Sequence, residues 1–113
     1  MAMKRMVLEF GMGTDISGAN PTKAALRALR YALSHNSLSI ATALGQSPEA
    51  MTIDVHIGVP RPHKVDEARV LAALPHGKGS VTVVDGGLEV HDDFGKASAL
   101  IANACAIVSL DIQ

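Results

Sequence analysis

The chain has 113 residues, of which 48% are hydrophobic and 3% aromatic, and its formal net charge is −1. This length fits a single domain spanning residues 1–113. The near-neutral charge and the absence of tryptophan exclude a general attraction to nucleic acid or to an anionic membrane surface.

The first predicted elements are a strand, a glycine-rich loop and a helix. Residues 5–10 alternate between apolar and polar side chains, which is typical of a half-buried strand. A loop is predicted over residues 11–20. Asn20 followed by Pro21 is a favoured helix start, because asparagine caps free backbone N–H groups and proline lacks one. This helix is expected to run to about Ser34.

The clearest strand spans residues 52–59, where every second residue is isoleucine or valine. Two prolines directly after it end the strand. Asp66 stands where it can cap a short helix, which is predicted over residues 67–73.

The remaining elements are predicted to be strands. Residues 81–84 and 88–90 are joined by the sequence Asp-Gly-Gly, which predicts a hairpin turn over residues 85–87. Isoleucine and valine favour a strand over residues 107–112. The alanine-rich residues 99–106 are compatible with either a helix or a strand.

Cys105 is the only cysteine, so no internal disulfide is expected, and this fits a reducing compartment. No segment approaches the roughly 20 apolar residues of a membrane helix. Glu9 interrupts the short apolar run near the start, which therefore does not resemble a signal peptide. We expect a cytoplasmic protein that does not associate with membranes.

The glycine-rich junction is the first candidate binding site. Gly11 and Gly13 lack the third glycine of a dinucleotide fingerprint, and Asp15 would repel a phosphate. The helix start at Asn20 nevertheless offers free N–H groups, and Lys23 adds a full positive charge, so a carboxylate or an amide oxygen could bind there. The alternative is a turn whose glycines adopt positive φ.

Three further residues are candidates for chemistry. Glu9 is predicted at the end of the first strand and is a candidate acid–base group. Asp54 and His56 share one face of strand 52–59 and, if the strands pair, would form a polar patch with Glu9. A solvated outer face is the alternative for Asp54.

Arg61 lies between two prolines, on a stiff turn at a strand end. Its guanidinium could bind an anionic substrate group there, or form an ordinary surface ion pair. The five histidines show no paired ligand spacing, so we expect no metal site, and no motif indicates a cofactor.

Three stretches carry a resemblance, namely "EFGMGTDISGANPTKAALRALRYAL" (9–33), "IGVPRPHKVDEARVLAALPHG" (57–77) and "VVDGGLEV" (83–90). Together they resemble a family of small conserved bacterial proteins of unassigned function. The resemblance implies an α+β fold similar to the Bacillus-type chorismate mutase, with a mixed four-stranded sheet and helices on one face. It also implies a homo-oligomer, either a trimer or a larger ring, with ligand sites between subunits.

The glycine junction is also similar to the glycine- and asparagine-rich segment of ring-opening cyclic amide hydrolases, such as cyanuric acid hydrolase and barbiturase. A lysine in that segment takes part in their chemistry, and Met12 stands where it would be expected here.

Two functions are compatible with these residues. In the first, the protein binds or converts a small polar or anionic metabolite between subunits, with Glu9 as the acid–base group, residues 11–20 as a wall, and Lys23 and Arg61 as anion contacts. In the second, it is a non-catalytic assembly or regulatory subunit whose glycines serve only folding. The motifs contain no complete catalytic set, so both functions stay open.

Overall fold

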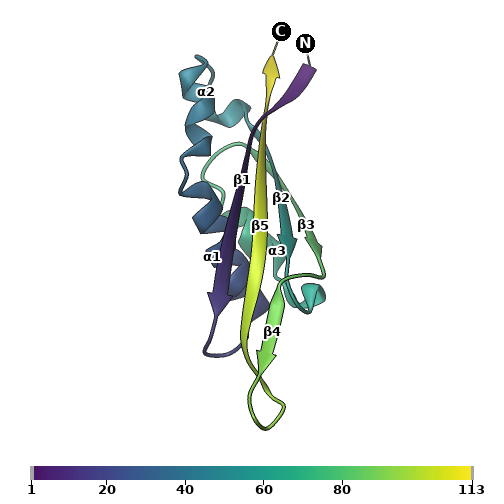
Figure 1. The fold of residues 1–113 in the computed structure, drawn as a ribbon. Helices are drawn as coiled ribbons and strands as arrows, with labels where there is room; N and C mark the ends of the chain where they lie inside the picture. Colours follow the sequence, from purple (N-terminus) through teal and green to yellow (C-terminus); the bar gives the residue numbers. More distant parts are fainter. Residues whose placement is uncertain (1, 113) are drawn as a thin grey trace.

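The computed structural model describes residues 2–112. Its elements in chain order are β1 (Ala2–Asp15), α1 (Pro21–Leu33), η1 (Ser37–Ser39), α2 (Ile40–Ala43), η2 (Pro48–Ala50), β2 (Thr52–Gly58), η3 (Pro62–Lys64), α3 (Glu67–Ala72), β3 (Lys78–Val84), β4 (Leu88–His91) and β5 (Ala97–Ile112). The fold is therefore α+β (Figure 1).

The sheet is mixed and has five strands. Its main part has the order β1-β5-β2-β3, in which β2 and β3 are parallel and β5 is antiparallel to both of its neighbours. The short strand β4 pairs with β5 along the same edge as β2, but further down. The main sheet thus has the expected four strands, and β4 joins it as a fifth, because the 16 residues of β5 are long enough to pair with two strands along one edge.

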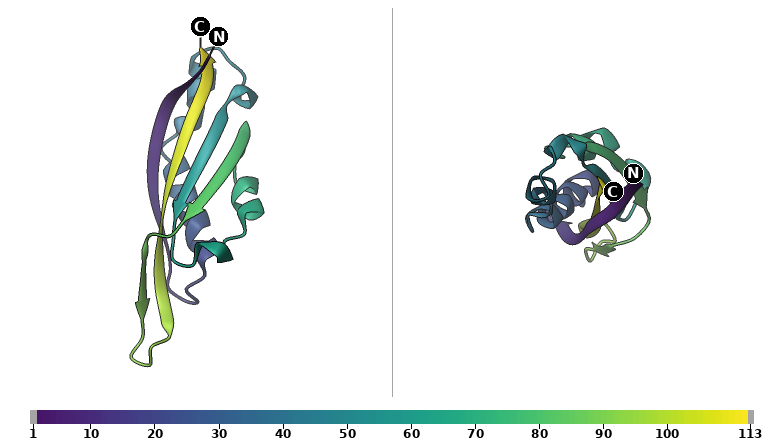
Figure 2. Two further views of the ribbon diagram at one scale, coloured as in Figure 1. Left: turned by 90° about the vertical axis from the view of Figure 1, so that its right-hand side faces the viewer. Right: turned by 90° about the horizontal axis from the view of Figure 1, so that it is seen from above.

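All helices pack on one face of the sheet (Figure 2). Helix α1 crosses β1 and β5, whereas α3 lies over β3 and buries Val70 completely. The predicted strand 52–59 is confirmed as β2, and its isoleucines and valines are directed into this layer and are at most 1% exposed.

The glycines of the predicted loop lie inside β1, so the expectation of a loop from residue 11 was wrong. Neither Gly11 nor Gly13 has a positive φ. Their role is a close approach of two backbones, because a Cβ on Gly11 would lie 2.2 Å from the carbonyl oxygen of Ala28, and one on Gly13 would lie 2.3 Å from the nitrogen of Ala28. Glycine in a strand interior often marks such an approach.

Residues 99–106 are part of the central strand β5, which decides between the two predicted conformations. Ala102, Ala104 and Ala106 are at most 2% exposed and lie on the face that α1 covers. Their small side chains, like the glycines of β1, let the helix lie close to the sheet. The alanines thus reflect tight packing rather than helix formation.

The predicted hairpin over residues 85–87 is also wrong, because β3 and β4 do not pair with each other. Gly87 has a φ of +64°, and a Cβ there would lie within bonding distance of the Ile101 carbonyl. Glycine at position 87 therefore allows the chain to run close to the backbone of β5. The hairpin that does form joins β4 to β5, and the Asp92 carboxylate accepts hydrogen bonds from the N–H groups of Phe94 and Lys96.

Both predicted helix caps are confirmed. The Asn20 side chain accepts a hydrogen bond from the Lys23 N–H at 3.2 Å, and the Asp66 side chain accepts one from the Arg69 N–H at 3.3 Å. Thr22 joins the two helix starts, since its hydroxyl accepts from the Asp66 N–H and donates to the Lys64 carbonyl.

Replacing Thr22 with valine keeps the side-chain shape and removes both hydrogen bonds. Thr22 is only 5% exposed, so the Asp66 N–H would lose its acceptor in a poorly hydrated site. We expect Thr22→Val to lower the free energy of unfolding by about 1–2 kcal/mol, measured by urea denaturation. Thr22→Ser retains the hydroxyl, and an equal loss in that variant would show that the methyl group rather than the hydrogen bonds is responsible.

The opposite face of the sheet has no helix over it, and we call it the open face. Cross-strand pairing places Phe10, Cys105 and His56 in a row on this face, with Cys105 between the other two. Its exposed large apolar side chains include Leu8, Phe10, Met12, Leu88 and Val90, with Ile16 beside them, and Met3 and Val84 nearer its other edges. Within residues 2–112, no helix combines the length and apolar character needed to cross a membrane.

Candidate functional site

The loop after β1 is organised around the carboxylate of Asp15. This side chain is 1% exposed and accepts a hydrogen bond from the Asn20 N–H at 2.8 Å. Arg27 approaches it to 3.4 Å and also donates to the Thr14 carbonyl at 2.6 Å. Asp15, which belongs to the glycine-rich junction that the sequence indicated as a candidate ligand-binding site, thus holds the strand-to-helix connection together.

The same contacts change the acidity of Asp15. The hydrogen bond from the Asn20 N–H is the main cause that holds the pKa of this carboxyl below its ordinary value of 3.8. Burial acts in the opposite direction, and the N–H of Ser17 and the charge of Arg27 add to the lowering. Asp15 is therefore a carboxylate at neutral pH and is not suited to donate a proton there.

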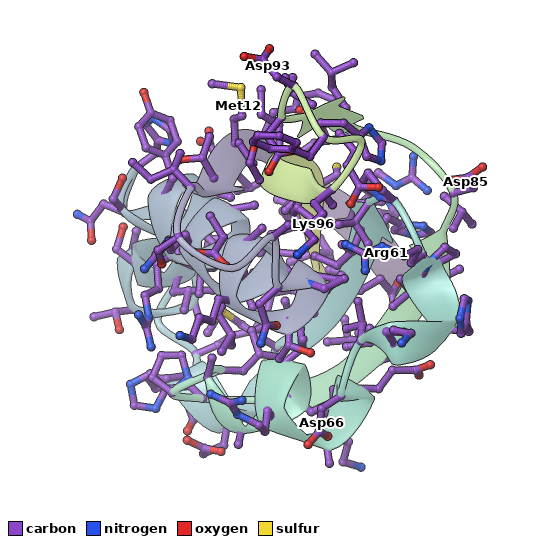
Figure 3. The ribbon with its side chains drawn as sticks, turned by 90° about the horizontal axis from the view of Figure 1, so that it is seen from below. Met12, Arg61, Asp66, Asp85, Asp93 and Lys96 are labelled. Atoms are coloured by element: carbon purple, nitrogen blue, oxygen red, sulfur yellow. The ribbon has the colours of Figure 1, made fainter. Side chains whose placement is uncertain are left out.

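Arg61 reaches the same loop from the end of β2. Its Nη2 donates to the Ala19 carbonyl at 2.8 Å and to the Glu89 carboxylate at 2.5 Å. Glu89 also lies 3.7 Å from the Nε2 of His91. We call these four residues the Arg61 corner. Seen from below, Arg61 lies to the right of the centre, whereas Met12 lies near the upper edge (Figure 3).

The guanidinium of Arg61 has N–H groups that make no hydrogen bond with the described residues. Among residues 2–112, both of its hydrogen bonds come from Nη2, and the buried Nε has no acceptor. The side chain is 36% exposed, so part of the guanidinium remains accessible to solvent. A planar guanidinium with unpaired N–H groups can bind a carboxylate or a phosphate.

Backbone strain is concentrated at this corner. Ala19 has a φ of +48° and Arg61 a φ of +54°, both in the left-handed region that non-glycine residues rarely adopt. The Arg61 side chain donates directly to the carbonyl of Ala19, so the two strained residues are joined. Strain of this kind is often retained where it serves a functional site.

The structure separates the residues that were expected to converge. Lys23 lies in the first turn of α1, at the end that Arg61 approaches through Ala19. Glu9 lies near the other end of α1, where its carboxylate is 3.5 Å from the Nδ1 of His35. Because the thirteen residues of α1 span about 20 Å, Glu9 cannot share a cavity with Lys23 within one chain.

The predicted polar patch of Glu9, Asp54 and His56 does not form either. Strand β5 lies between β1 and β2, and Glu9 faces α1, whereas Asp54 and His56 lie on the open face. The Ser80 hydroxyl donates to the Asp54 carboxylate at 2.5 Å. No group of His, Cys, Asp or Glu side chains suited to a metal ion occurs among residues 2–112.

Glu89 and His91 were not anticipated, because they reach Arg61 only through the pairing of β4 with β5. The local sequence does not predict that pairing, because the glycines before β4 suggest a hairpin with the preceding strand. Alternation within residues 88–91 could have separated Glu89 from Leu88 and Val90, which lie on the other face.

Comparison with known proteins places these features in a family. The family described as "Conserved hypothetical protein (Lin0512_fam)" matches residues 5–108. The chain belongs to the Lin0512 family. None of the curated proteins matches it. The match covers most of β1 and of β5 and the whole Arg61 corner, so the candidate site lies within the part of the chain that defines the family.

A solved relative has the same fold over nearly its whole length. The crystal structure of an FtsZ-like protein of unknown function from Nostoc punctiforme is 40% identical, with a TM-score of 0.85 and 99% of each chain covered. The similarity extends over the whole sheet and its helices. It supports the family assignment and attaches no activity to this chain.

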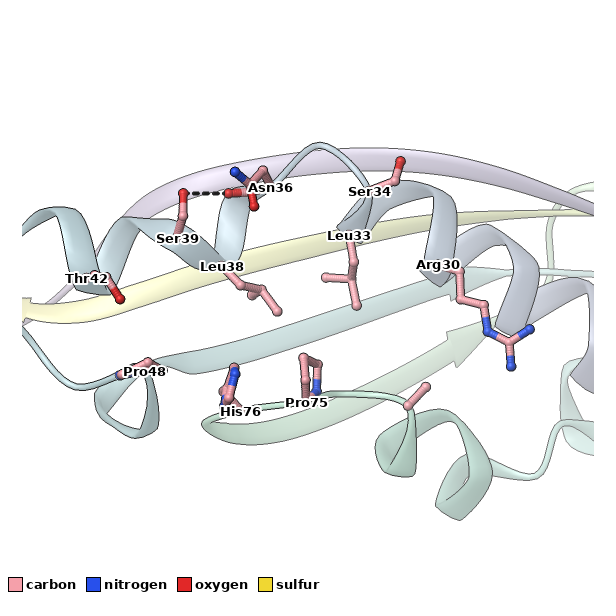
Figure 4. Close-up of a pocket in the computed structure, with 11 residues that line it drawn as sticks. Arg30, Leu33, Ser34, Asn36, Leu38, Ser39, Thr42, Pro48, Pro75 and His76 are labelled. Carbon is pink, nitrogen blue, oxygen red and sulfur yellow. Dashed lines mark hydrogen bonds between the residues drawn. The ribbon is translucent and has the colours of Figure 1, made fainter.

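This Lin0512 family member also has a groove that no sequence motif indicated. It has a volume of about 530 Å³ and runs between the α1–α2 side and the segment before β3 (Figure 4). Leu33 and Leu38 point across it toward Pro75 and His76. His76 forms a hydrogen bond with Glu49 at 3.0 Å, which holds the pKa of that carboxyl below its usual range.

Proposed function

We propose that this Lin0512 family member is a homo-oligomeric protein that binds a small polar or anionic metabolite at the Arg61 corner. The observation that carries the proposal is the unused part of the Arg61 guanidinium, which is held in place by a strained backbone and two acceptors. A carboxylate, a phosphate or an amide carbonyl could complete its hydrogen bonds. Lys23, at the same end of α1, would add positive charge.

The surroundings of Arg61 favour a ligand with both acceptor and donor groups. Glu89 neutralises part of the guanidinium charge, and its second oxygen faces His91. A ligand donor could bind to that carboxylate while a ligand acceptor binds to Arg61. The site is open to solvent on the single chain, so a neighbouring subunit would have to close it, as in the trimer or larger ring that the sequence resemblance implies.

The similarities to chorismate mutase and to the cyclic amide hydrolases, which the sequence implies, are part of the same proposal. A mixed sheet with helices on one face is consistent with the chorismate-mutase-like fold implied by the sequence. Cyclic amides are one ligand class compatible with Arg61, although Met12 lies exposed on the open face rather than at this corner.

The acid–base role of Glu9 is a separate hypothesis that would require a second site beside His35. The unpaired Cys105 supports a cytoplasmic location.

A non-catalytic assembly subunit is the second candidate function. It is favoured by the engagement of Asp15, Arg27 and Glu9 with partners inside the chain. In that case the Arg61 contacts would only stabilise the loop before α1. The two functions differ in whether the accessible part of Arg61 binds a ligand.

Calorimetric titration of the purified protein with inorganic phosphate, malonate and barbiturate distinguishes them. We expect at least one of these probes to bind the wild-type protein and to bind Arg61→Gln at least tenfold more weakly, because glutamine lacks both the charge and the planar fork. Arg30→Gln is the matched control, since Arg30 makes no ion pair among the described residues and lies farther along α1.

Arg61→Lys tests whether charge alone is sufficient, and it should bind more weakly than the wild type because lysine cannot donate two parallel hydrogen bonds. Circular dichroism at the titration temperature establishes that each variant is folded. Equal affinity in the wild type and in Arg61→Gln, or no binding of any probe to the wild type, would reject the Arg61 corner as the binding site and favour the assembly subunit.

A further inference from the structure

The open face exposes many large apolar side chains. Six of them are between 43% and 77% exposed, namely Leu8, Phe10, Met12, Ile16, Leu88 and Val90. Extended exposed apolar patches of this kind mark interaction surfaces in soluble proteins.

The overall shape of the chain agrees with a second layer covering the open face of the sheet. The chain measures 57 × 22 × 18 Å, and its radius of gyration of 15.4 Å exceeds the roughly 13 Å expected for its length. One helical layer covers one face of a long sheet (Figure 2). A sheet whose second face is apolar is normally covered by another layer.

The open face also has an exposed phenyl ring and an apolar pocket. Phe10 is 67% exposed and projects from the middle of β1. Toward the lower end lies an apolar pocket of about 150 Å³, lined among others by Ile16, Leu88 and Val90. A cavity of about 150 Å³ is large enough to hold a benzene ring.

We propose that a second copy of this chain covers the open face, and that Phe10 of each copy enters the apolar pocket of the other. Phe10 lies on β1, and the pocket is formed by Thr14 of β1 together with residues of β4 and β5, with Met12 between Phe10 and Thr14. A two-fold axis passing near Met12 would therefore place each phenyl ring over the partner's pocket, with the two β1 strands running in opposite directions. The interface would be isologous, which is the commonest arrangement of soluble oligomers.

The charges on the face agree with this register. Arg5 pairs with Ser109, and the β4–β5 hairpin lies about as far beyond Asn103, the partner of Met12, in the other direction. At about 3.3 Å per residue, each distance is roughly 20 Å. The two-fold axis would therefore place Arg5 of one copy over the acidic hairpin of the other, which contains Asp93. A polar contact at each end would surround the apolar centre.

Light scattering coupled to size exclusion tests the pairing. We expect the wild-type protein to have the mass of an even number of copies. Phe10→Glu and Leu88→Glu each alter an exposed side chain, so the fold should persist while the mass falls to that of one copy or of half the assembly. Tyr31→Glu, at a 57% exposed position on the helical face, should keep the wild-type mass.

A rescue experiment tests the register. If Phe10 enters the pocket beside Leu88, combining Phe10→Lys with Leu88→Glu in one chain places opposite charges together at both ends of the interface. The single variant Phe10→Lys should lose the wild-type mass as Phe10→Glu does, and the double variant should regain the mass that Phe10→Lys and Leu88→Glu each lose. Cys105, which pairs with Phe10 in register, should react at least tenfold faster with a thiol reagent in Leu88→Glu than in the wild type.

A monomeric or trimeric wild-type mass would overturn the proposal, and so would a double variant no better than its single variants. Equal Cys105 reactivity in the wild type and in Leu88→Glu would do the same. None of these measurements uses a ligand or Arg61. A trimeric mass would overturn the pairing alone, whereas a monomeric mass would also remove the neighbouring subunit that the proposed metabolite site needs.

Discussion

Gly11→Ala and Gly13→Ala are each expected to lower the free energy of unfolding by at least about 3 kcal/mol. The added methyl group would overlap the backbone of α1, with Ala28 atoms at 2.2 and 2.3 Å from the two Cβ positions. Backbone atoms cannot move aside as a flexible side chain can, so the helix would have to lift off the sheet. Since small domains are stable by only about 5–15 kcal/mol, either variant could be largely unfolded.

Urea denaturation followed by circular dichroism measures this loss. Gly18→Ala is the matched control, because φ at Gly18 is not positive and a Cβ there meets only a side-chain oxygen of Asp15, at 3.8 Å. That variant should be neutral, or more stable by about 0.4–1 kcal/mol because the unfolded chain is stiffer. Wild-type stability in Gly11→Ala and Gly13→Ala would show that α1 does not lie this close to β1.

Asp15→Ala is expected to cost about 3 kcal/mol at neutral pH. The substitution removes the acceptor of the Asn20 N–H in a buried position and leaves Arg27 without its carboxylate partner. Asp85→Ala changes an exposed aspartate in the segment between β3 and β4, and it should have little effect.

The cost of Asp15→Ala should depend on pH. Because the folded-state pKa of Asp15 is below its ordinary value of 3.8, its carboxylate contributes stability that is fully present above that value and is lost as pH falls through the folded-state pKa. The difference in unfolding free energy between the wild type and Asp15→Ala should therefore shrink below about pH 4. A difference that stays constant from pH 7 to pH 3 would contradict the role assigned to this carboxylate.

The local features of the fold were predictable because they depend on neighbouring residues. The caps at Asn20 and Asp66 and the alternation of β2 are read within one or two turns of chain. The role of Gly11 and the conformation of residues 99–106 depend on α1 crossing the sheet. A glycine that makes room for a distant helix looks in sequence like a glycine that makes a turn.

In the candidate site, too, the residues with a local sequence signal were predictable, and those brought in by distant strand pairing were not. Arg61 and Lys23 were indicated by their local setting, and both lie at the start of α1. The position of Glu9 depends on which face of β1 it occupies and on how far the strand continues, and the glycines suggested an end that does not exist. Glu89 enters the site only because β4 pairs with β5 rather than with β3.

Strand β4 connects the two proposals. Its Glu89 faces the helical layer and binds Arg61, while Leu88 and Val90 point to the open face. A second copy seated on the open face would press on the same short strand that holds the Arg61 corner. Pairing and ligand binding could therefore influence each other through a displacement of β4, as in other proteins in which two sites share one element.

The central position of β5 determines when this protein can fold during its synthesis. Strand β1 pairs with β5 along its whole length, from Ala2 beside Ile112 to Asp15 beside Leu100, and β2 pairs with β5 as well. Until residues 97–112 have been synthesised, β1 lacks its neighbouring strand, although α1 can already pack on it. The sheet can then form only by closing loops between residues far apart in the sequence, which makes its folding slow.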